Sequence, residues 1–158
     1  MILYHGSNTA IEAIDFNMCK PYKDFGHGFY LTEIEQQAKL MARRTASIYG
    51  GEAVVSVFEF DESAALNDSE LSVKRFDEPD EEWALFVMNN RSRTHKHPCH
   101  EYDLVIGPVA DDTIATLFRN FDDGIIDLPN LVSGLKFKKI SSQYFFHSRK
   151  ALVYLKAL

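Results

Sequence analysis

Cysteine is scarce in this chain of 158 residues, which contains two thiols, Cys19 and Cys99. Eighty positions separate them, so they form neither a disulfide framework nor the paired C-x-x-C of a zinc site. Long apolar runs are missing as well, since stretches such as 84–88 fall far below the ~20 residues that cross a bilayer. The opening MILYHGSN lacks the basic and apolar regions of a signal peptide. We therefore expect a cytoplasmic protein with no membrane association.

Positive charge is in deficit, with 17 Lys+Arg against 23 Asp+Glu and a formal net charge of -6. This balance disfavours a general nucleic-acid binder, although one local basic patch would suffice to engage a strand. No internal repeat and no Gly/Ser- or Pro-rich linker divides the chain. The sequence predicts a single globular domain over residues 1–158.

Strand-like and helix-like segments are mixed without regular βαβ alternation, which predicts an α+β fold. Strands are expected where β-branched and aromatic residues gather between turn signals, at 2–5, 28–31, 53–60, 102–107 and 142–146. Helices are expected at 33–44, from 79 or 80 to 91, after 111–112, at 128–135 and from 148.

Two local details sharpen these expectations. The turn residues that begin at Gly6 are expected to stop the first strand. The spacing Thr32-x-x-Glu35 is that of a capping box, and the helix after it is expected to turn Ile34, Ala38 and Met41 inward.

Two short motifs imitate known nucleotide sites. Asp24-Phe25-Gly26 matches the magnesium-binding DFG of protein kinases, but no HRD-type loop precedes it and the chain is too short for a kinase. Gly26-x-Gly28 lacks the third glycine and the preceding strand of a dinucleotide-binding fingerprint, and no P-loop sequence is present. A kinase and a Rossmann-type NAD site are both unsupported.

The stretch RSRTHKHPCHE carries the densest set of nitrogen and sulfur ligands, from His95 to His100. Because no second ligand pair stands elsewhere at finger spacing, we favour a solvated loop over a zinc site and expect no metal. Arg91, Arg93 and Lys96 could contact phosphate, but a wet surface loop is again the commoner explanation.

Three separated motifs, YHGS, GHGFYLT and SQY, occur in the order of a known signature. The sequence resembles the ADP-ribosyltransferase superfamily of the diphtheria-toxin and poly(ADP-ribose) polymerase type. With YDLVIGPVADD and QYFFH added, it is most similar to a bacterial family of small proteins, domain of unknown function 3990, assigned to that superfamily. The resemblance implies a split antiparallel β-sheet core with peripheral helices, and NAD as co-substrate.

The resemblance also implies the site. By motif match, the catalytic residues are His5, Tyr30 and Gln143, where His5 contacts a ribose hydroxyl and Tyr30 stacks on nicotinamide. The NAD-binding set implied by the resemblance is His5, Gly6, Ser7, Gly28, Tyr30 and Met41. Met41 stands where family members of the two-tyrosine kind carry a second aromatic.

Gln143 departs from the signature, since the best-known members carry Glu there. A carboxamide keeps the hydrogen bond but loses the negative charge, which costs about 2.7 to 4 kcal/mol of barrier. Mono-ADP-ribosylation is therefore favoured over chain elongation. Asp24 and Asp103 are two carboxylates that could compensate, although each is more often a turn or capping residue.

The resulting hypothesis is a mono-ADP-ribosyltransferase that modifies a protein more readily than a nucleic acid. The resemblance adds a role as the toxin of a bacterial toxin-antitoxin pair, with a small antitoxin protein as partner. One alternative is a catalytically weak NAD- or ADP-ribose-binding module, motivated by the missing Glu. Another is a nucleic-acid-directed relative of the same fold, which would use the basic residues of 91–96 together with Lys136, Lys138 and Lys139.

Overall fold

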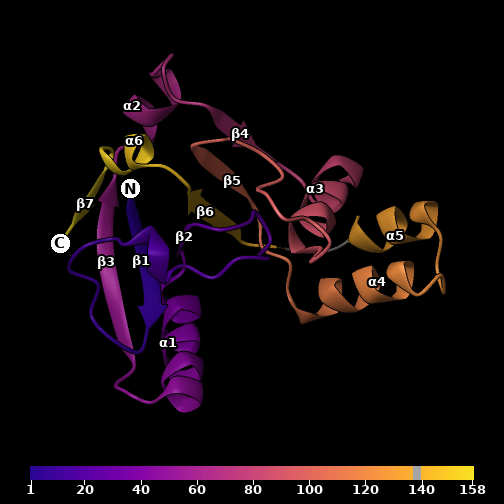
Figure 1. Cartoon of the computed structure of the whole chain (residues 1–158), viewed down its shortest axis with the longest axis horizontal. Coiled ribbons are helices and arrows are strands. Elements are labelled where there is room, and N and C mark those ends of the chain that lie inside the picture. Colours follow the sequence, from indigo (N-terminus) through magenta and orange to yellow (C-terminus); the bar gives the residue numbers. More distant parts are fainter. Residues whose placement is uncertain (137–139) are drawn as a thin grey trace.

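The computed structural model describes residues 1–136 and 140–158 and contains a seven-stranded sheet with helices around it (Figure 1). Lys138 and Lys139 lie outside the described residues. The strands are β1 (Ile2–Ser7), β2 (Phe29–Thr32), β3 (Val54–Phe60), β4 (Val73–Arg75), β5 (Leu104–Pro108), β6 (Ser142–Phe146) and β7 (Leu155–Ala157). The helices are the 3-10 turn η1 (Phe16–Met18), α1 (Glu35–Tyr49), α2 (Glu62–Asn67), α3 (Glu81–Arg91), α4 (Asp112–Asp122), α5 (Leu128–Leu135) and α6 (Arg149–Leu152). The predicted α+β class is confirmed.

The sheet has the strand order β4-β5-β6-β2-β1-β3-β7 and is mixed. The expected antiparallel core is found in part, because one pairing, that of β4 with β5, is parallel. The two are joined through helix α3, and a crossover helix of this kind is what lets successive strands run in the same direction. All the other pairings are antiparallel.

The junction between β1 and β2 is the weakest pairing inside the sheet. A single register pair, Tyr4 with Thr32, joins the two strands. By contrast, β2 and β6 share four register pairs, from Phe29↔Phe146 to Thr32↔Gln143. Beyond Tyr4 and Thr32, the facing edges of β1 and β2 are therefore not paired with each other.

Two apolar clusters cover the two faces of the sheet. Side chains alternate between faces along each strand, so neighbours in sequence belong to different clusters. Phe146 belongs to the first cluster, with Leu3, Phe29 and Phe60, whereas Phe145 belongs to the second, with Phe25 and Trp83. The second cluster reaches α3, α4 and α5, which Figure 1 shows gathered at one end of the molecule, away from α1.

The inward face of α1 differs from the prediction. Ala38 is buried as expected, but Ile34 is 39% exposed and Met41 is 48% exposed. The reason is close backbone contact, since a Cβ added at Gly6 would lie 2.0 Å from the carbonyl oxygen of Ala38. A helix this close to a strand admits only small residues on the contact face, here Ala38 and Ala42.

Local boundaries shift by a few residues. Strand β1 continues through Gly6 to Ser7, so the expected stop at Gly6 is wrong. Helix α1 begins at Glu35, and Thr32 accepts from the Ile34 backbone N–H instead of forming the expected capping box. Helix α3 begins after the N-cap Asp80 and ends at Arg91 as predicted. Among the described helices, none is both long and apolar enough to cross a bilayer.

Candidate functional site

His5 lies at the β1–β2 junction and replaces a missing strand contact. Its Nδ1 lies 2.8 Å from the backbone oxygen of Tyr30, and because a carbonyl only accepts, Nδ1 carries the proton. The imidazole therefore satisfies a carbonyl that β1 would otherwise bond in a continuous ladder. Burial lowers the pKa of His5, so the ring is neutral near pH 7 and Nε2 is left as an acceptor.

Tyr30 is bound into the turn that precedes β2. Its phenol donates to the carbonyl oxygen of Gly26 at 2.8 Å and accepts from the backbone N–H of Phe25 at 3.0 Å. Its ring lies 4.9 Å from that of Phe145, centroid to centroid. Burial and the nearby charge of Asp24 raise the pKa of Tyr30 well above its ordinary value. The hydroxyl thus holds the turn at Phe25–Gly26 in place.

Gln143 is buried, with 8% of its surface exposed, and both of its N–H groups are engaged. Nε2 donates to Oδ2 of Asp24 at 2.8 Å and to the carbonyl oxygen of Pro108 at 3.1 Å. Among the described residues Oε1 has no hydrogen-bond partner. Every buried side-chain nitrogen or oxygen of those residues has one, so Oε1 is exposed to solvent. What Gln143 can offer a ligand is therefore an acceptor.

Asp24 is the centre of this arrangement, which we call the Asp24 network: Asp24, Arg91, Gln143 and the Ala110 backbone. Oδ1 accepts from Arg91 Nε at 2.8 Å and from Nη2 at 2.6 Å. Oδ2 accepts from Gln143 and, at 3.1 Å, from the backbone N–H of Ala110. One carboxylate thus joins four segments that are far apart in sequence.

The Asp24 network revises two sequence-based interpretations. Arg91 is the last residue of α3 and forks onto a carboxylate, so its assignment to a wet surface loop is wrong. Of the two carboxylates considered as neighbours of Gln143, Asp24 contacts it, whereas Asp103 accepts from the backbone N–H of Ser72. No local sequence pattern predicts the contact between Asp24 and Gln143, because 119 positions separate the two residues.

A second polar chain lies beside Gln143. Thr32 is the register partner of Gln143, and its hydroxyl donates to Oε1 of Gln37 at 2.8 Å. Gln37 Nε2 in turn donates to the hydroxyl of Ser141 at 2.6 Å. The chain ties β2, α1 and the residue before β6 together on the face that carries Gln143.

The three predicted catalytic residues flank the junction on different faces of the sheet. Register pairs place Tyr4, Thr32 and Gln143 on one face, and the alternation along β2 puts Tyr30 there too. His5 follows Tyr4 and so points to the other face, where its ring lies 4.4 Å from that of Phe29. Contact between His5 and Tyr30 runs through the backbone carbonyl, not through the phenol.

The remaining predicted NAD-binding residues have structural surroundings of their own. Gly6 is required by the approach of α1, and a Cβ at Gly28 would lie 2.4 Å from the ring of Phe145. Ser7 ends β1 opposite Val54. Met41 stands on the exposed flank of α1.

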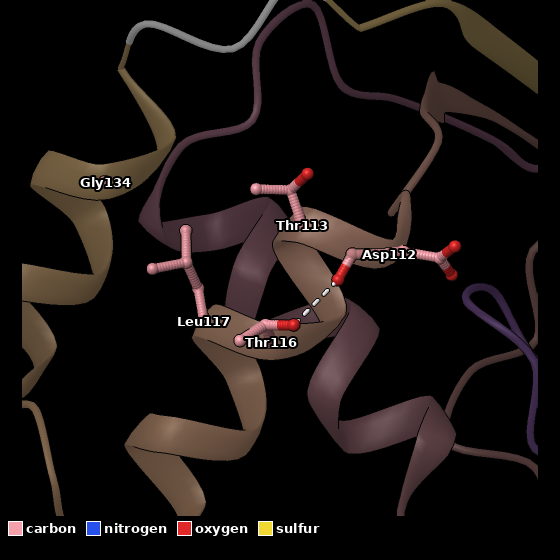
Figure 2. A pocket seen from close by; sticks show the side chains of 5 residues that line it. All are labelled: Asp112, Thr113, Thr116, Leu117 and Gly134. Carbon is pink, nitrogen blue, oxygen red and sulfur yellow. Dashed lines mark hydrogen bonds between the residues drawn. The ribbon is translucent and has the colours of Figure 1, made fainter.

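A cavity of about 560 Å³ lies away from these residues, between the start of α4 and α5. Figure 2 shows Thr113, Thr116 and Leu117 of α4 near Gly134 of α5, with the Thr116 hydroxyl donating to the Asp112 carbonyl at 3.0 Å. Its lining contains one ionisable residue, Asp112, and no histidine, cysteine or basic residue, so it offers no cationic partner for an anion.

The histidine-rich stretch lies against a small cavity. Within residues 1–136 and 140–158, no three His, Cys, Asp or Glu side chains are placed to hold an ion. Five histidines instead line a second cavity of about 150 Å³, whose walls include Phe25 and Gly26.

Residues 1–157 match the model of a family described as "Protein of unknown function (DUF3990)". No curated protein and no solved structure matches the chain.

Proposed function

The chain belongs to the DUF3990 family, and from this premise we propose that it is an NAD-dependent mono-ADP-ribosyltransferase. The observation that carries the proposal is the β1–β2 junction, where pairing stops after Tyr4 and Thr32. Two acceptor atoms beside it have no partner among the described residues, Nε2 of His5 on one face and Oε1 of Gln143 on the other. A dinucleotide lying across the junction could meet both, because it carries two riboses, one on each side of its pyrophosphate.

The reaction breaks the bond between C1′ of the ribose and the nicotinamide nitrogen. Nicotinamide leaves with the bonding electron pair, the acceptor donates a lone pair to C1′, and the acceptor's proton passes to solvent. The transition state is oxocarbenium-like, so positioning of the nucleotide contributes more than a strong base does.

In this proposal Gln143 accepts a hydrogen bond from a ribose hydroxyl through Oε1. The Asp24 carboxylate binds the amide nitrogen of the same side chain at 2.8 Å, which fixes its orientation and polarises Oε1 toward negative charge. Arg91 offsets most of the Asp24 charge, because its guanidinium lies within 2.6 Å of the same carboxylate. We therefore expect turnover slower than that of a site with Glu in this position.

His5 supplies the second contact. Neutral and protonated at Nδ1, it accepts from the other ribose hydroxyl through Nε2. Tyr30 contributes the face of its ring, since its hydroxyl is occupied by the Phe25–Gly26 backbone. In this proposal the molecule that receives ADP-ribose is a protein. A role as a toxin requires that ADP-ribosylation of that protein arrest growth.

The test is incubation of the purified protein with labelled NAD and cell extract. Wild type should release nicotinamide and transfer label, and Gln143→Ala should lower both by about a hundredfold or more. Gln36→Ala, an exposed glutamine on α1, is the matched control and should keep wild-type activity. Equal label transfer by wild type and Gln143→Ala, or none by wild type, would contradict the proposal.

A binding module without turnover is the second candidate, favoured by the way the Asp24 network uses both N–H groups of Gln143. Calorimetry separates the two: NAD binding without nicotinamide release identifies the module.

A further inference from the structure

A small cavity gathers most of the histidine in the protein. Its volume is about 150 Å³, and five of the six histidines line it. They come from three segments: the turn before β2 (His27), the loop after α3 (His95, His97 and His100) and the residue after β6 (His147). Lys96 lines it too, and no Asp or Glu does, although the chain has 23 acidic residues. The cavity is therefore locally basic in an acidic protein.

His100 forms the neutral floor of this cavity. Its Nε2 donates to the carbonyl oxygen of Phe25 at 2.6 Å, and its Nδ1 accepts from the backbone N–H of Tyr102 at 3.1 Å. Both nitrogens are used, and burial lowers the pKa of His100, with a smaller contribution from His147. His100 positions the walls, and its lowered pKa favours the neutral ring.

His147 is held differently. Its Nδ1 donates to the backbone oxygen of His27 at 2.7 Å, which leaves Nε2 as the second ring nitrogen. Among the described residues Nε2 has no partner and is not buried. When the ring is protonated, Nε2–H becomes a charged donor for a ligand.

The charged groups around His147 do not cancel this donor. Asp24, on the turn before β2, is occupied by Arg91 and Gln143, and Asp103, before β5, accepts from Ser72. Burial raises the pKa of Cys99, so its thiol adds no negative charge. The other charged side chains of these segments are Lys23, Arg93, Lys96 and the exposed Glu101, which does not line the cavity.

The size and chemistry of the cavity select its ligand. A volume of about 150 Å³ is below the ~300 Å³ at which pockets enclose whole drug-sized molecules. No three side chains among the described residues are arranged for a metal ion. Lysine and protonated histidine are donors that anions bind. Tyr22 also lines the cavity, and it is the one non-glycine residue among those described that has a positive φ, 59°. The guanidinium of Arg93 lies over its ring.

We propose that this cavity binds a phosphate-sized anion, either free phosphate or the phosphoryl end of a larger ligand. The proposal is independent of the enzymatic one, because it uses none of His5, Tyr30 and Gln143.

The experiment is titration of the whole chain with inorganic phosphate, followed by calorimetry at about pH 6 and about pH 8. Affinity should be higher at the lower pH, where histidine side chains in general are more often protonated and phosphate is still an anion. His147→Gln keeps a donor for the His27 carbonyl but removes the imidazole Nε2, and it should lower the affinity at about pH 6 by about tenfold. Lys96→Gln, on the exposed loop, should do the same without affecting folding.

Lys156→Gln on β7, at the far edge of the sheet, is the matched control and should bind phosphate as wild type does. Adenosine monophosphate distinguishes the sources: binding at least as tight as phosphate assigns the phosphoryl end of a nucleotide, and weaker binding assigns the free anion. Absence of phosphate binding at about pH 6, or unchanged binding in both cavity variants, overturns the proposal. Zinc binding that His147→Gln abolishes, without phosphate binding, overturns it as well.

Discussion

The Asp24 network and the small cavity lined by five histidines, here called the histidine cavity, are neighbours along the turn before β2. They differ in how far their hydrogen-bonding groups are already paired. The Asp24 carboxylate accepts four hydrogen bonds, and both N–H groups of Gln143 are used. The histidine cavity has no acidic lining residue and leaves Nε2 of His147 unpaired among the described residues. A saturated cluster stabilises the fold, whereas a cluster with spare donors is suited to a ligand.

Removing the central acceptor should have the largest effect. Asp24→Ala leaves Arg91, Gln143 and the Ala110 N–H without their partner, and the free energy of unfolding should fall by about 3 kcal/mol. Asp77→Ala, whose exposed carboxylate pairs with Arg75, should cost under about 1 kcal/mol. Urea unfolding measures both. Equal costs would mean that the Asp24 network does not stabilise the fold.

Gln143→Glu should cost about 2 kcal/mol, because it places a second carboxylate beside Asp24. One of the two acids then binds a proton in the folded state more tightly than in the unfolded state. Stability should therefore fall as pH rises through about 4 to 8. The double variant Asp24→Asn with Gln143→Glu restores one amide and one carboxylate and should recover part of the loss. No recovery would contradict the pairing.

Tyr30→Phe should cost about 1 to 2 kcal/mol, since it leaves the Phe25 N–H and the Gly26 carbonyl without the phenol. Tyr22→Phe, at the more exposed wall of the histidine cavity, should change stability by under about 0.5 kcal/mol. Thermal unfolding of the pair provides the comparison, and the reverse order would refute it.

The smallest expected effect is on acid stability. The folded pKa of His100 is lowered, so its ring binds fewer protons in the folded than in the unfolded chain. Stability from this residue is present above the unfolded pKa of about 6.5 and is lost as pH falls below that value and through the lowered folded pKa. His100→Gln keeps one donor and one acceptor without titrating. Its urea midpoint should decline less than that of wild type between about pH 7.5 and 5, and an identical decline would contradict the assignment.

Local sequence signals predict those helices and strands whose ends are set by residues within or next to the element itself. Helix α3 begins after the N-cap Asp80, whose carboxylate accepts from the Trp83 N–H, and strand β6 has the expected bounds. Strands β4 and β7 were not predicted, because three residues are too few to show a period.

Contacts over long sequence separations escape the same reasoning. Met41 is exposed because Gly6 on β1 brings α1 so close that small residues fill the contact. The sequence suggests Gln143 by its place in a motif, but its bond to Asp24 depends on the sheet bringing the two together.

Chemical-shift mapping during an NAD titration shows whether NAD binds across the β1–β2 junction. The largest shifts should occur at the ring of His5 and the side-chain amide of Gln143, with the Asp24 network intact. Saturable NAD binding that leaves both signals unmoved and shifts only the ring of His147 would contradict it.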